Sequence, residues 1–429
     1  MTRFFNAMIK SFVWLLLVVL PFFSASQASV LTQSSSLEQA YVRCWHRLGH
    51  STNGAQSRWV WATNNDGSYY TIAGRWHAFS SGASLFYTEV SQQALLARCR
   101  STIGGTVDHS DMLFYAADNF LSLNYMIWTQ DDSTSFDEEG INKIVAFGDS
   151  LSDTGNLFNA SSWLLPNRHS WYVGHFTNGL LWTEYIARSL QLPLYTWAVG
   201  GSGGQDHLFI AKGVTSQIES FKHYSQKAQG YSPETTLFTL GFGANDFLIF
   251  HLTMDQILSG VDAVFESFLL LNPKHILLML LPDISILPLY SDKTLTEKKA
   301  LSDKIYRVNQ YIKMQCERLK QQGREVACFD TFSFVNHLIN EPKTYDLVNT
   351  QAPCLDINVR NLAVFGYPQT VSDQCFALGA DRYLFWDAIH PTTRVHKIIA
   401  DYLGETLLTT FSFVGAFQVN IDHKNASMQ

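Results

Sequence analysis

One serine of this chain follows a strand-like segment at a position where a nucleophile could act. Residues 144–146 are apolar, and the run Phe-Gly-Asp-Ser-Leu-Ser-Asp at 147–153 comes after them, which predicts a strand that ends in a turn carrying Ser150. In open α/β sheets, ligands bind at the carboxyl ends of the strands. The Ser150 hydroxyl could attack an ester carbonyl there if a histidine base and oxyanion donors lie nearby.

A candidate base for this serine lies near the C-terminus. Asp387 and His390 are three residues apart in the run Phe-Trp-Asp-Ala-Ile-His-Pro at 385–391. If folding brings His390 to Ser150, the imidazole can take the hydroxyl proton, while Asp387 holds the imidazole tautomer and stabilises the imidazolium. The alternative interpretation of His390 is a residue at the entry to a helix, because the proline after it suits a first helical turn.

Two segments between these motifs could donate hydrogen bonds to a tetrahedral intermediate. Gly201 ends the run Ala-Val-Gly-Gly at 198–201 and can bring its backbone N–H close because it lacks a Cβ. Asn245, in the run Gly-Phe-Gly-Ala-Asn-Asp, offers a side-chain amide, and the backbone N–H of Ser150 is a third candidate. Alone, each segment is an ordinary loop, and the glycine run lacks the Gly-Lys-Ser/Thr ending of a nucleotide-binding loop.

Together and in this order, the four segments resemble the four blocks of the GDSL (SGNH) hydrolases. Phe-Thr-Asn-Gly at 176–179 and His-Pro-Thr-Thr at 390–393 are similar to the lipolytic subgroup that contains bacterial glycerophospholipid:cholesterol acyltransferases and thermolabile, lecithin-dependent haemolysins. The resemblance implies a catalytic Ser150, Asp387 and His390, with Ser150, Gly201 and Asn245 as the oxyanion hole. It implies no cofactor and no metal.

Two departures from the family pattern affect its details. The second block usually carries an asparagine, and here Thr196 or Trp197 stands near that place, which leaves the choice between Gly200 and Gly201 open. The subgroup commonly has an arginine before its Phe-Ser-Asn-Gly motif, where this chain has His175, so the preference for a lipid head group stays open.

Composition is typical of a globular, exported protein. Hydrophobic residues make up 46% of the 429 residues and charged residues 16%, which permits a large core. The net charge of −7 argues against nucleic acid as a partner. Residues 1–28 have the pattern of a signal peptide, with Arg3 and Lys10, an apolar run at 13–23 that is shorter than a membrane span, and a small-x-small cleavage site. This predicts secretion, with attachment to the cell surface as an alternative.

Six cysteines in an exported chain predict disulfide bonds. Proximity in sequence favours the pairs Cys44–Cys99, Cys316–Cys328 and Cys354–Cys375. An ordinary buried thiol is the alternative for Cys316, which lies in a helical pattern. Cys44, His46 and His50 could suggest a metal site, but no second cluster completes four zinc ligands, which favours a disulfide cysteine beside surface histidines.

Periodicity and turn residues predict two folded regions. The first alternates strand-like runs with helical runs at 37–48 and 91–100, which indicates an α+β domain. The second alternates strands and helices, which predicts a doubly wound parallel sheet with helices on both faces. The predicted organisation is a signal peptide at 1–28, an N-terminal α+β domain at 29–130, a linker at 131–140, a GDSL hydrolase domain at 141–411 and a C-terminal tail at 412–429.

The resemblance implies acyl transfer through an acyl-serine intermediate. With water as the acceptor, the enzyme would be a phospholipase A and lysophospholipase that acts transiently at a membrane surface on phospholipid or lysophospholipid. A sterol is a second candidate acceptor. The alternative enzyme is a carboxylesterase or carbohydrate O-acetylesterase for soluble esters. The alternative without catalysis is a secreted, membrane-binding toxin or adhesin that uses the fold as a scaffold.

The segment between Cys354 and Cys375 precedes the Asp387 motif and contains an apolar cluster at 362–367. A lid over a lipid site would use such residues, whereas the alternative is a stapled surface loop with a satellite core. In acyltransferase relatives such a loop is a target of proteolytic activation, which makes an activating protease a candidate partner. His396 is expected to be a structural histidine with satisfied hydrogen bonds.

Overall fold

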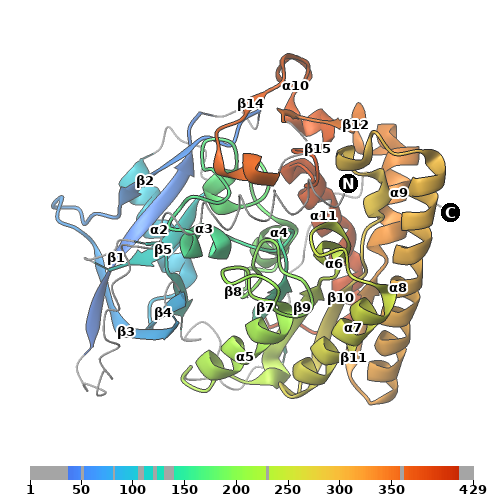
Figure 1. Cartoon of the computed structure of the whole chain (residues 1–429). Helices are drawn as coiled ribbons and strands as arrows, with labels where there is room; N and C mark the ends of the chain where they lie inside the picture. Colours follow the sequence, from blue (N-terminus) through green and yellow to red (C-terminus); the bar gives the residue numbers. More distant parts are fainter. Residues whose placement is uncertain are drawn as a thin grey trace.

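The computed structural model describes residues 37–49, 53–80, 83–104, 111–118, 123–129, 140–228, 231–357 and 362–414. The signal peptide predicted at 1–28, the linker apart from Gly140, and most of the predicted tail lie outside these residues. The described part contains a mainly antiparallel sheet and a separate parallel sheet (Figure 1). No helix among these residues is long and apolar enough to cross a membrane.

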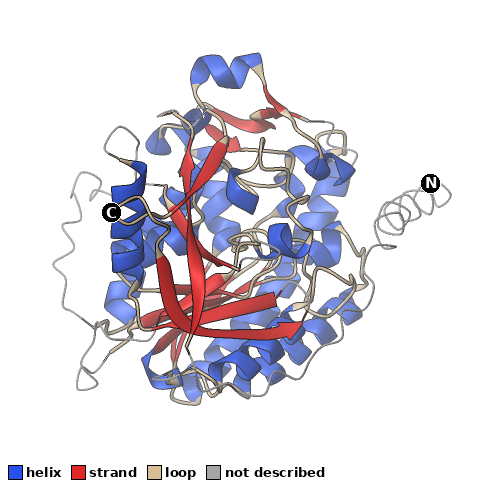
Figure 2. Ribbon diagram, turned by 90° about the vertical axis from the view of Figure 1, so that its left-hand side faces the viewer, coloured by secondary structure: helices blue, strands red, loops and turns tan. Residues whose placement is uncertain are grey.

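The described part of the N-terminal region is a mainly antiparallel sheet with helix α2 (Gln92–Ile103), which confirms the predicted α+β class. Its strand order is β2-β1-β3-β4-β6, with β5 paired to β1, and only the β4–β6 pair is parallel. In Figure 2 this sheet faces the viewer. The strands are β1 (Glu38–Arg47), β2 (Ser57–Trp61), β3 (Thr71–Ser80), β4 (Ala83–Thr88), β5 (Leu113–Ala117) and β6 (Met126–Thr129).

The helix predicted at 37–48 is wrong, because this segment forms strand β1, which pairs with β2, β3 and β5. Val42 and Cys44 are fully buried in the core of the N-terminal sheet, while Arg43 and Trp45 on the opposite face are fully buried as well. A strand buried on both faces lacks the alternation of polar and apolar residues that marks a strand in sequence.

The second region is built on a five-stranded parallel sheet with the order β11-β10-β9-β7-β8, which confirms the predicted class. After β7 the chain adds β8 on one side and β9 on the other. This reversal creates the switch point at which ligands bind in doubly wound sheets. The strands are β7 (Lys143–Gly148), β8 (Leu194–Thr196), β9 (Thr236–Gly241), β10 (His275–Met279) and β11 (Glu325–Phe329).

Helices flank this sheet in two groups. Helices α4 and α11 pack against each other, and α7 packs against both α5 and α8 (Figure 1). The helices are α3 (Asn156–Ala160), α4 (Trp182–Ser189), α5 (Val214–Ser225), α6 (Ala244–Leu248), α7 (Met254–Leu269), α8 (Leu295–Gln321), α9 (Thr331–Asn340), α10 (Asp373–Leu378) and α11 (Thr393–Thr410). Two small sheets pair β12 (Asn349–Pro353) with β15 (Tyr383–Phe385) and β13 (Leu355–Asp356) with β14 (Thr370–Val371).

Buried hydrophobic residues form three clusters, and two of them contain residues of both regions. One joins Leu85 and Trp128 to the core of the parallel sheet. Another joins Trp45 of β1 to Trp171 and Trp386. The two regions therefore share hydrophobic cores.

The six cysteines form the three predicted disulfides, Cys44–Cys99, Cys316–Cys328 and Cys354–Cys375. The first bridge joins β1 to α2, and the second joins α8 to β11. His46, expected at the surface beside Cys44, is instead buried, and its Nε2 accepts a hydrogen bond from Arg58 Nε at 3.2 Å.

Candidate active site

Ser150 lies two residues beyond the carboxyl end of β7, at the switch point of the parallel sheet. Every residue of β7 is buried, which gives the turn a rigid base. The strand ends at Gly148, whose φ is +154°, and a Cβ there would lie 2.4 Å from the Gly241 carbonyl oxygen of β9. Only glycine fits this close approach between the two strands. The next residue, Asp149, accepts the Leu151 N–H and closes the turn.

The loop between β15 and α11 brings Asp387 and His390 to Ser150. The Ser150 Oγ lies 2.8 Å from His390 Nε2, and His390 Nδ1 lies 2.9 Å from Asp387 Oδ2. All three residues are buried, with Ser150 7% exposed and His390 3% exposed. The three residues singled out in the sequence therefore form one chain of hydrogen bonds, although 240 positions separate the serine from the histidine.

Trp171 joins this chain and was missed by the sequence analysis. Its indole N–H donates to Asp387 Oδ2 at 2.8 Å, and the side chain is fully buried. The other carboxylate oxygen, Oδ1, accepts the backbone N–H groups of Ile389 and His390. No spacing in the sequence points to Trp171, because its partner lies 216 positions away.

The loop after β8 and the start of helix α6, which follows β9, present the remaining predicted residues. The Gly200 N–H donates to Asp153 Oδ2 at 2.7 Å, whereas the N–H groups of Gly201 and Ser150 have no hydrogen-bond partner among the described residues. Gly201 has a φ of +81°, which favours glycine. Asn245 donates one amide hydrogen to the Ser202 carbonyl, leaving its second amide hydrogen available. This arrangement favours Gly201 over Gly200 as an oxyanion donor.

Hydrogen bonds join the motif at 176–179 to the motif at 390–393. Thr177 Oγ1 donates to the carbonyl of Pro391 at 2.9 Å, and Asn178 Oδ1 accepts the N–H of Thr393 at 2.8 Å. The Phe176 ring lies 4.9 Å from the His390 ring, measured between centroids. The first motif therefore fixes the backbone on the C-terminal side of His390.

Ionisable groups around the site are buried. Burial raises the pKa of Asp149 to about 6 and also raises the pKa of Asp246 to about 6. His175, which replaces the subgroup's arginine, lies 3.0 Å from Glu184 Oε2 of α4. Burial opposes charge on His175, but the neighbouring carboxylate outweighs it and raises the pKa of His175.

His396 is buried on α11, as a structural histidine would be, but neither ring nitrogen has a hydrogen-bond partner among the described residues. The expectation of a satisfied histidine is therefore wrong. Burial, with smaller contributions from His390 and His175, lowers the pKa of His396 to about 3. The buried ring is therefore uncharged at neutral pH.

The segment between Cys354 and Cys375 reaches the candidate triad through Phe365. Its ring centroid lies 5.6 Å from that of His390 and 5.1 Å from that of Trp171. The carbonyl of Phe365 accepts the Asn167 N–H at 2.8 Å. Tyr367, Phe376 and Leu378 of the same part of the chain are exposed. The apolar cluster predicted at 362–367 thus has one member packed on the site, while the side chains of residues 362 and 363 lie outside the described ones.

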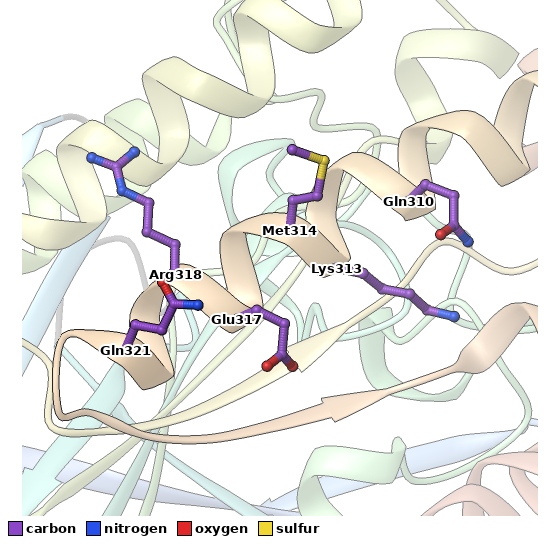
Figure 3. Close-up of a pocket in the computed structure, with 6 residues that line it drawn as sticks. All are labelled: Gln310, Lys313, Met314, Glu317, Arg318 and Gln321. Atoms are coloured by element: carbon purple, nitrogen blue, oxygen red, sulfur yellow. The ribbon is translucent and has the colours of Figure 1, made fainter.

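A depression elsewhere on the surface is unrelated to this site. Its lining residues lie along one face of α8, as Figure 3 shows, and none belongs to the loops that carry the candidate triad. They are Gln310, Lys313, Met314, Glu317, Arg318 and Gln321.

The fold and this site define the class of protein. Residues 144–403 match the GDSL-like lipase/acylhydrolase family, and residues 21–130 match the N-terminal domain of the Vibrio dual lipase/transferase. The chain belongs to the GDSL-like lipase/acylhydrolase family, which confirms the resemblance found in the sequence. It is therefore an esterase or lipase.

Three relatives carry more specific names. The thermolabile hemolysin of Vibrio parahaemolyticus is 38% identical over 411 residues, which cover 93% of this chain and 98% of that protein. The phosphatidylcholine-sterol acyltransferase of Aeromonas hydrophila is 26% identical over 311 residues, 63% of this chain and 92% of that protein. The secreted effector protein SseJ of Salmonella typhimurium is 26% identical over 284 residues, 63% of this chain and 65% of that protein.

Proposed function

We propose that this lipolytic hydrolase is exported and cleaves acyl esters of glycerophospholipids, as a phospholipase A and lysophospholipase, through an acyl-Ser150 intermediate. The observation that carries the proposal is the hydrogen-bonded series from Ser150 through His390 to Asp387. A serine hydroxyl at 2.8 Å from an imidazole nitrogen has the geometry required for proton transfer during attack.

In the first half of the reaction, Ser150 Oγ bonds to the ester carbonyl carbon and its proton passes to His390 Nε2. The carbonyl oxygen takes the electron pair and becomes an oxyanion, which the N–H groups of Ser150 and Gly201 and the Asn245 amide stabilise. As the intermediate collapses, the carbon–oxygen bond of the alcohol breaks, and His390 returns the proton to the leaving lysophospholipid. Asp387 stabilises the imidazolium throughout this half.

In the second half, an acceptor hydroxyl releases the acyl group. Water loses a proton to His390 and attacks the acyl-serine carbonyl carbon. The bond between this carbon and Ser150 Oγ then breaks, and His390 returns the proton to Oγ, which yields a fatty acid and free Ser150. A sterol hydroxyl could replace water in the same position, and the named activity of the Aeromonas relative supports a sterol as the second acceptor.

The disulfide-bounded segment supports a gated site. Phe365 lies against His390 and Trp171, so movement of this ring would alter the surroundings of the triad. We propose that the segment between Cys354 and Cys375 is a lid, and that cleavage within it by a protease activates the enzyme on lipid aggregates. The bridge closes a loop of about 22 residues, worth about 3 kcal/mol in the chain-entropy model. As a covalent link, it also keeps both ends of a cut lid attached.

The proposed export rests on the signal-peptide pattern and on the three disulfides, which form in oxidising compartments. The relative from Salmonella is named a secreted protein, which agrees with export. Release from the cell is the proposed destination, with retention on the cell surface as the alternative.

One incubation tests the function. The purified protein is mixed with vesicles of phosphatidylcholine, lysophosphatidylcholine and cholesterol, and all products are resolved. We expect fatty acid from both phospholipids, cholesteryl ester where the sterol is the acceptor, and no product from Ser150→Ala, because loss of the nucleophile typically costs many orders of magnitude in rate. Hydrolysis of soluble or acetylated sugar esters alone would favour a carboxylesterase or O-acetylesterase. Membrane binding without labelling by a serine-reactive phosphonate would favour a toxin or adhesin without catalysis.

A further inference from the structure

Arg47 of the N-terminal sheet reaches into the motif that holds the candidate triad. It is the last residue of β1, and its side chain is 4% exposed. Its Nη2 lies 2.7 Å from Asp111 Oδ2, and its Nε donates to the same carboxylate oxygen at 2.9 Å. The same Nη2 donates to the carbonyl oxygen of Asn178 at 2.6 Å. The guanidinium therefore bridges two regions that are far apart in sequence.

The guanidinium also contacts Tyr172, the residue after Trp171. The Arg47 Cζ lies 4.8 Å from the centroid of the Tyr172 ring, a distance at which cation–π attraction contributes. The Tyr172 hydroxyl donates to the carbonyl of Asp111. The neighbour of Tyr172, Trp171, holds Asp387 through its indole N–H. The Arg47–Asp111 pair thus holds Tyr172, and its neighbour Trp171 orients Asp387.

Asn178 connects the guanidinium to the histidine loop. Its carbonyl accepts from Arg47, and its side-chain oxygen accepts the N–H of Thr393 at 2.8 Å. Thr177 donates to Pro391, the residue directly after His390. A shift of the Asn178 backbone would therefore move the backbone on which the His390 ring is mounted.

The N-terminal region also contacts the other side of the site. The Tyr115 hydroxyl of β5 donates to the carbonyl of Thr154, four residues after Ser150, at 3.0 Å. Trp45, two residues before Arg47, is packed in the same hydrophobic cluster as Trp171 and Trp386. Contacts from one sheet thus reach both the serine turn and the segments that hold the histidine.

We propose that Arg47, held by Asp111, is a positioning residue through which the N-terminal region keeps His390 and Asp387 aligned with Ser150. This inference rests on the proposed serine hydrolase function and gives the N-terminal region a role in the chemical step. Arg47 touches neither the reacting atoms nor the candidate triad itself, so it acts through Asn178 and Tyr172. Its fork of N–H donors suits this task, because lysine cannot bind the carboxylate and the carbonyl in the same geometry.

The test compares Arg47→Ala with a control variant in the same N-terminal region, Arg98→Ala on helix α2. The Arg98 guanidinium also lies 4.8 Å from a tyrosine ring, that of Tyr70, and it donates to the Thr63 carbonyl at 3.4 Å, so both of these contacts stay within the N-terminal region. Full-length proteins are assayed on a short soluble ester. We expect Arg47→Ala to lower kcat about 10- to 100-fold with KM little changed, because displacement of a catalytic group by about 1 Å costs rates of this size. Arg98→Ala should stay within about twofold of the wild type, the ordinary range for a contact outside the site.

Rescue by a small molecule separates positioning from general stability. Methylguanidinium added to Arg47→Ala can occupy the space of the missing side chain, bind Asp111 and the Asn178 carbonyl, and restore most of kcat. A kcat of Arg47→Ala within about twofold of the wild type would overturn the inference, as would a loss that methylguanidinium fails to recover in a folded protein. If Arg47→Ala does not fold, Arg47→Lys and Asp111→Asn replace it, and wild-type kcat in both would overturn the inference equally.

Failure of this inference differs from failure of the proposed function. If the wild type is active, Ser150→Ala is inactive and Arg47→Ala is fully active, only the positioning role of Arg47 is refuted. A wild type that hydrolyses no ester and reacts with no phosphonate would remove the function itself.

Discussion

At the scale of single residues, the carboxylate of Asp387 is held by four donors. They are the His390 ring, the Trp171 indole and the backbone N–H groups of Ile389 and His390. Hydrogen bonds to a charged group are worth more than neutral ones, because they satisfy a buried charge that would otherwise be costly. With all four donors bonded, the Asp387 carboxylate has one orientation. This orientation directs the His390 imidazole toward Ser150.

The indole of Trp171 provides a direct test of this idea. Trp171→Phe removes the donor to Asp387, whereas Trp386→Phe removes an equally buried indole N–H that donates to the Ser170 carbonyl instead. We expect Trp171→Phe to lower kcat on a soluble ester at least tenfold more than Trp386→Phe, since small misplacements of a catalytic group are costly. Thermal melting of both variants provides the control for stability. Equal kcat values would show that Asp387 keeps its orientation without the indole.

The role proposed for Asn245 is to stabilise the oxyanion, so its replacement should give a different kinetic result. Asn245→Ala removes one oxyanion donor while Ser150 and His390 keep their contact, so kcat should fall about 10²–10³-fold with KM little changed. The variant should still react slowly with a serine-directed phosphonate. A variant that loses binding while kcat is preserved would move Asn245 from stabilisation of the oxyanion to contact with the substrate.

At the scale of elements, the sequence predicts what is encoded locally. Short buried strands such as β10, followed by amphipathic helices, alternate in a pattern that a parallel sheet requires, so the second region is predicted correctly. The helix predicted at 37–48, where β1 lies, is wrong because burial of both faces of β1 removes the polar alternation that marks a strand. Trp171 and Arg47 are absent from the prediction because their partners are remote in sequence, and only the fold reveals such contacts.

The disulfide-bounded segment is the element whose movement should control access. Phe365 packs on His390, while Tyr367 on the same segment is exposed and available for a lipid surface. Cutting the chain between Cys354 and Cys375 should raise activity on phospholipid vesicles several-fold more than activity on a short soluble ester, because only the longer substrate needs the proposed lid to move. Mass spectrometry confirms the cut, and both substrates are assayed before and after. Equal activity on both would leave the segment as a structural staple.

At the scale of the whole molecule, the two regions share hydrophobic cores, although each has its own sheet. Trp45 packs with Trp171 and Trp386, and Leu85 and Trp128 lie in the core of the parallel sheet. Burial of a large aromatic side chain contributes several kcal/mol, so separation of the two regions would expose surface on both. The N-terminal sheet and the hydrolase core should therefore unfold as one unit.

Hydrogen exchange measured by mass spectrometry tests this cooperativity. Peptides from β1 and β7 should report the same free energy of opening, because neither region retains a complete core without the other. Trp45→Ala should lower that free energy by about 3–5 kcal/mol, the usual cost of deleting a buried aromatic side chain. Both peptides should then exchange faster by the same factor. If Trp45→Ala speeds exchange in β1 while β7 stays protected, the two regions fold independently. The N-terminal sheet could then hold the site only while it is docked on the parallel-sheet region.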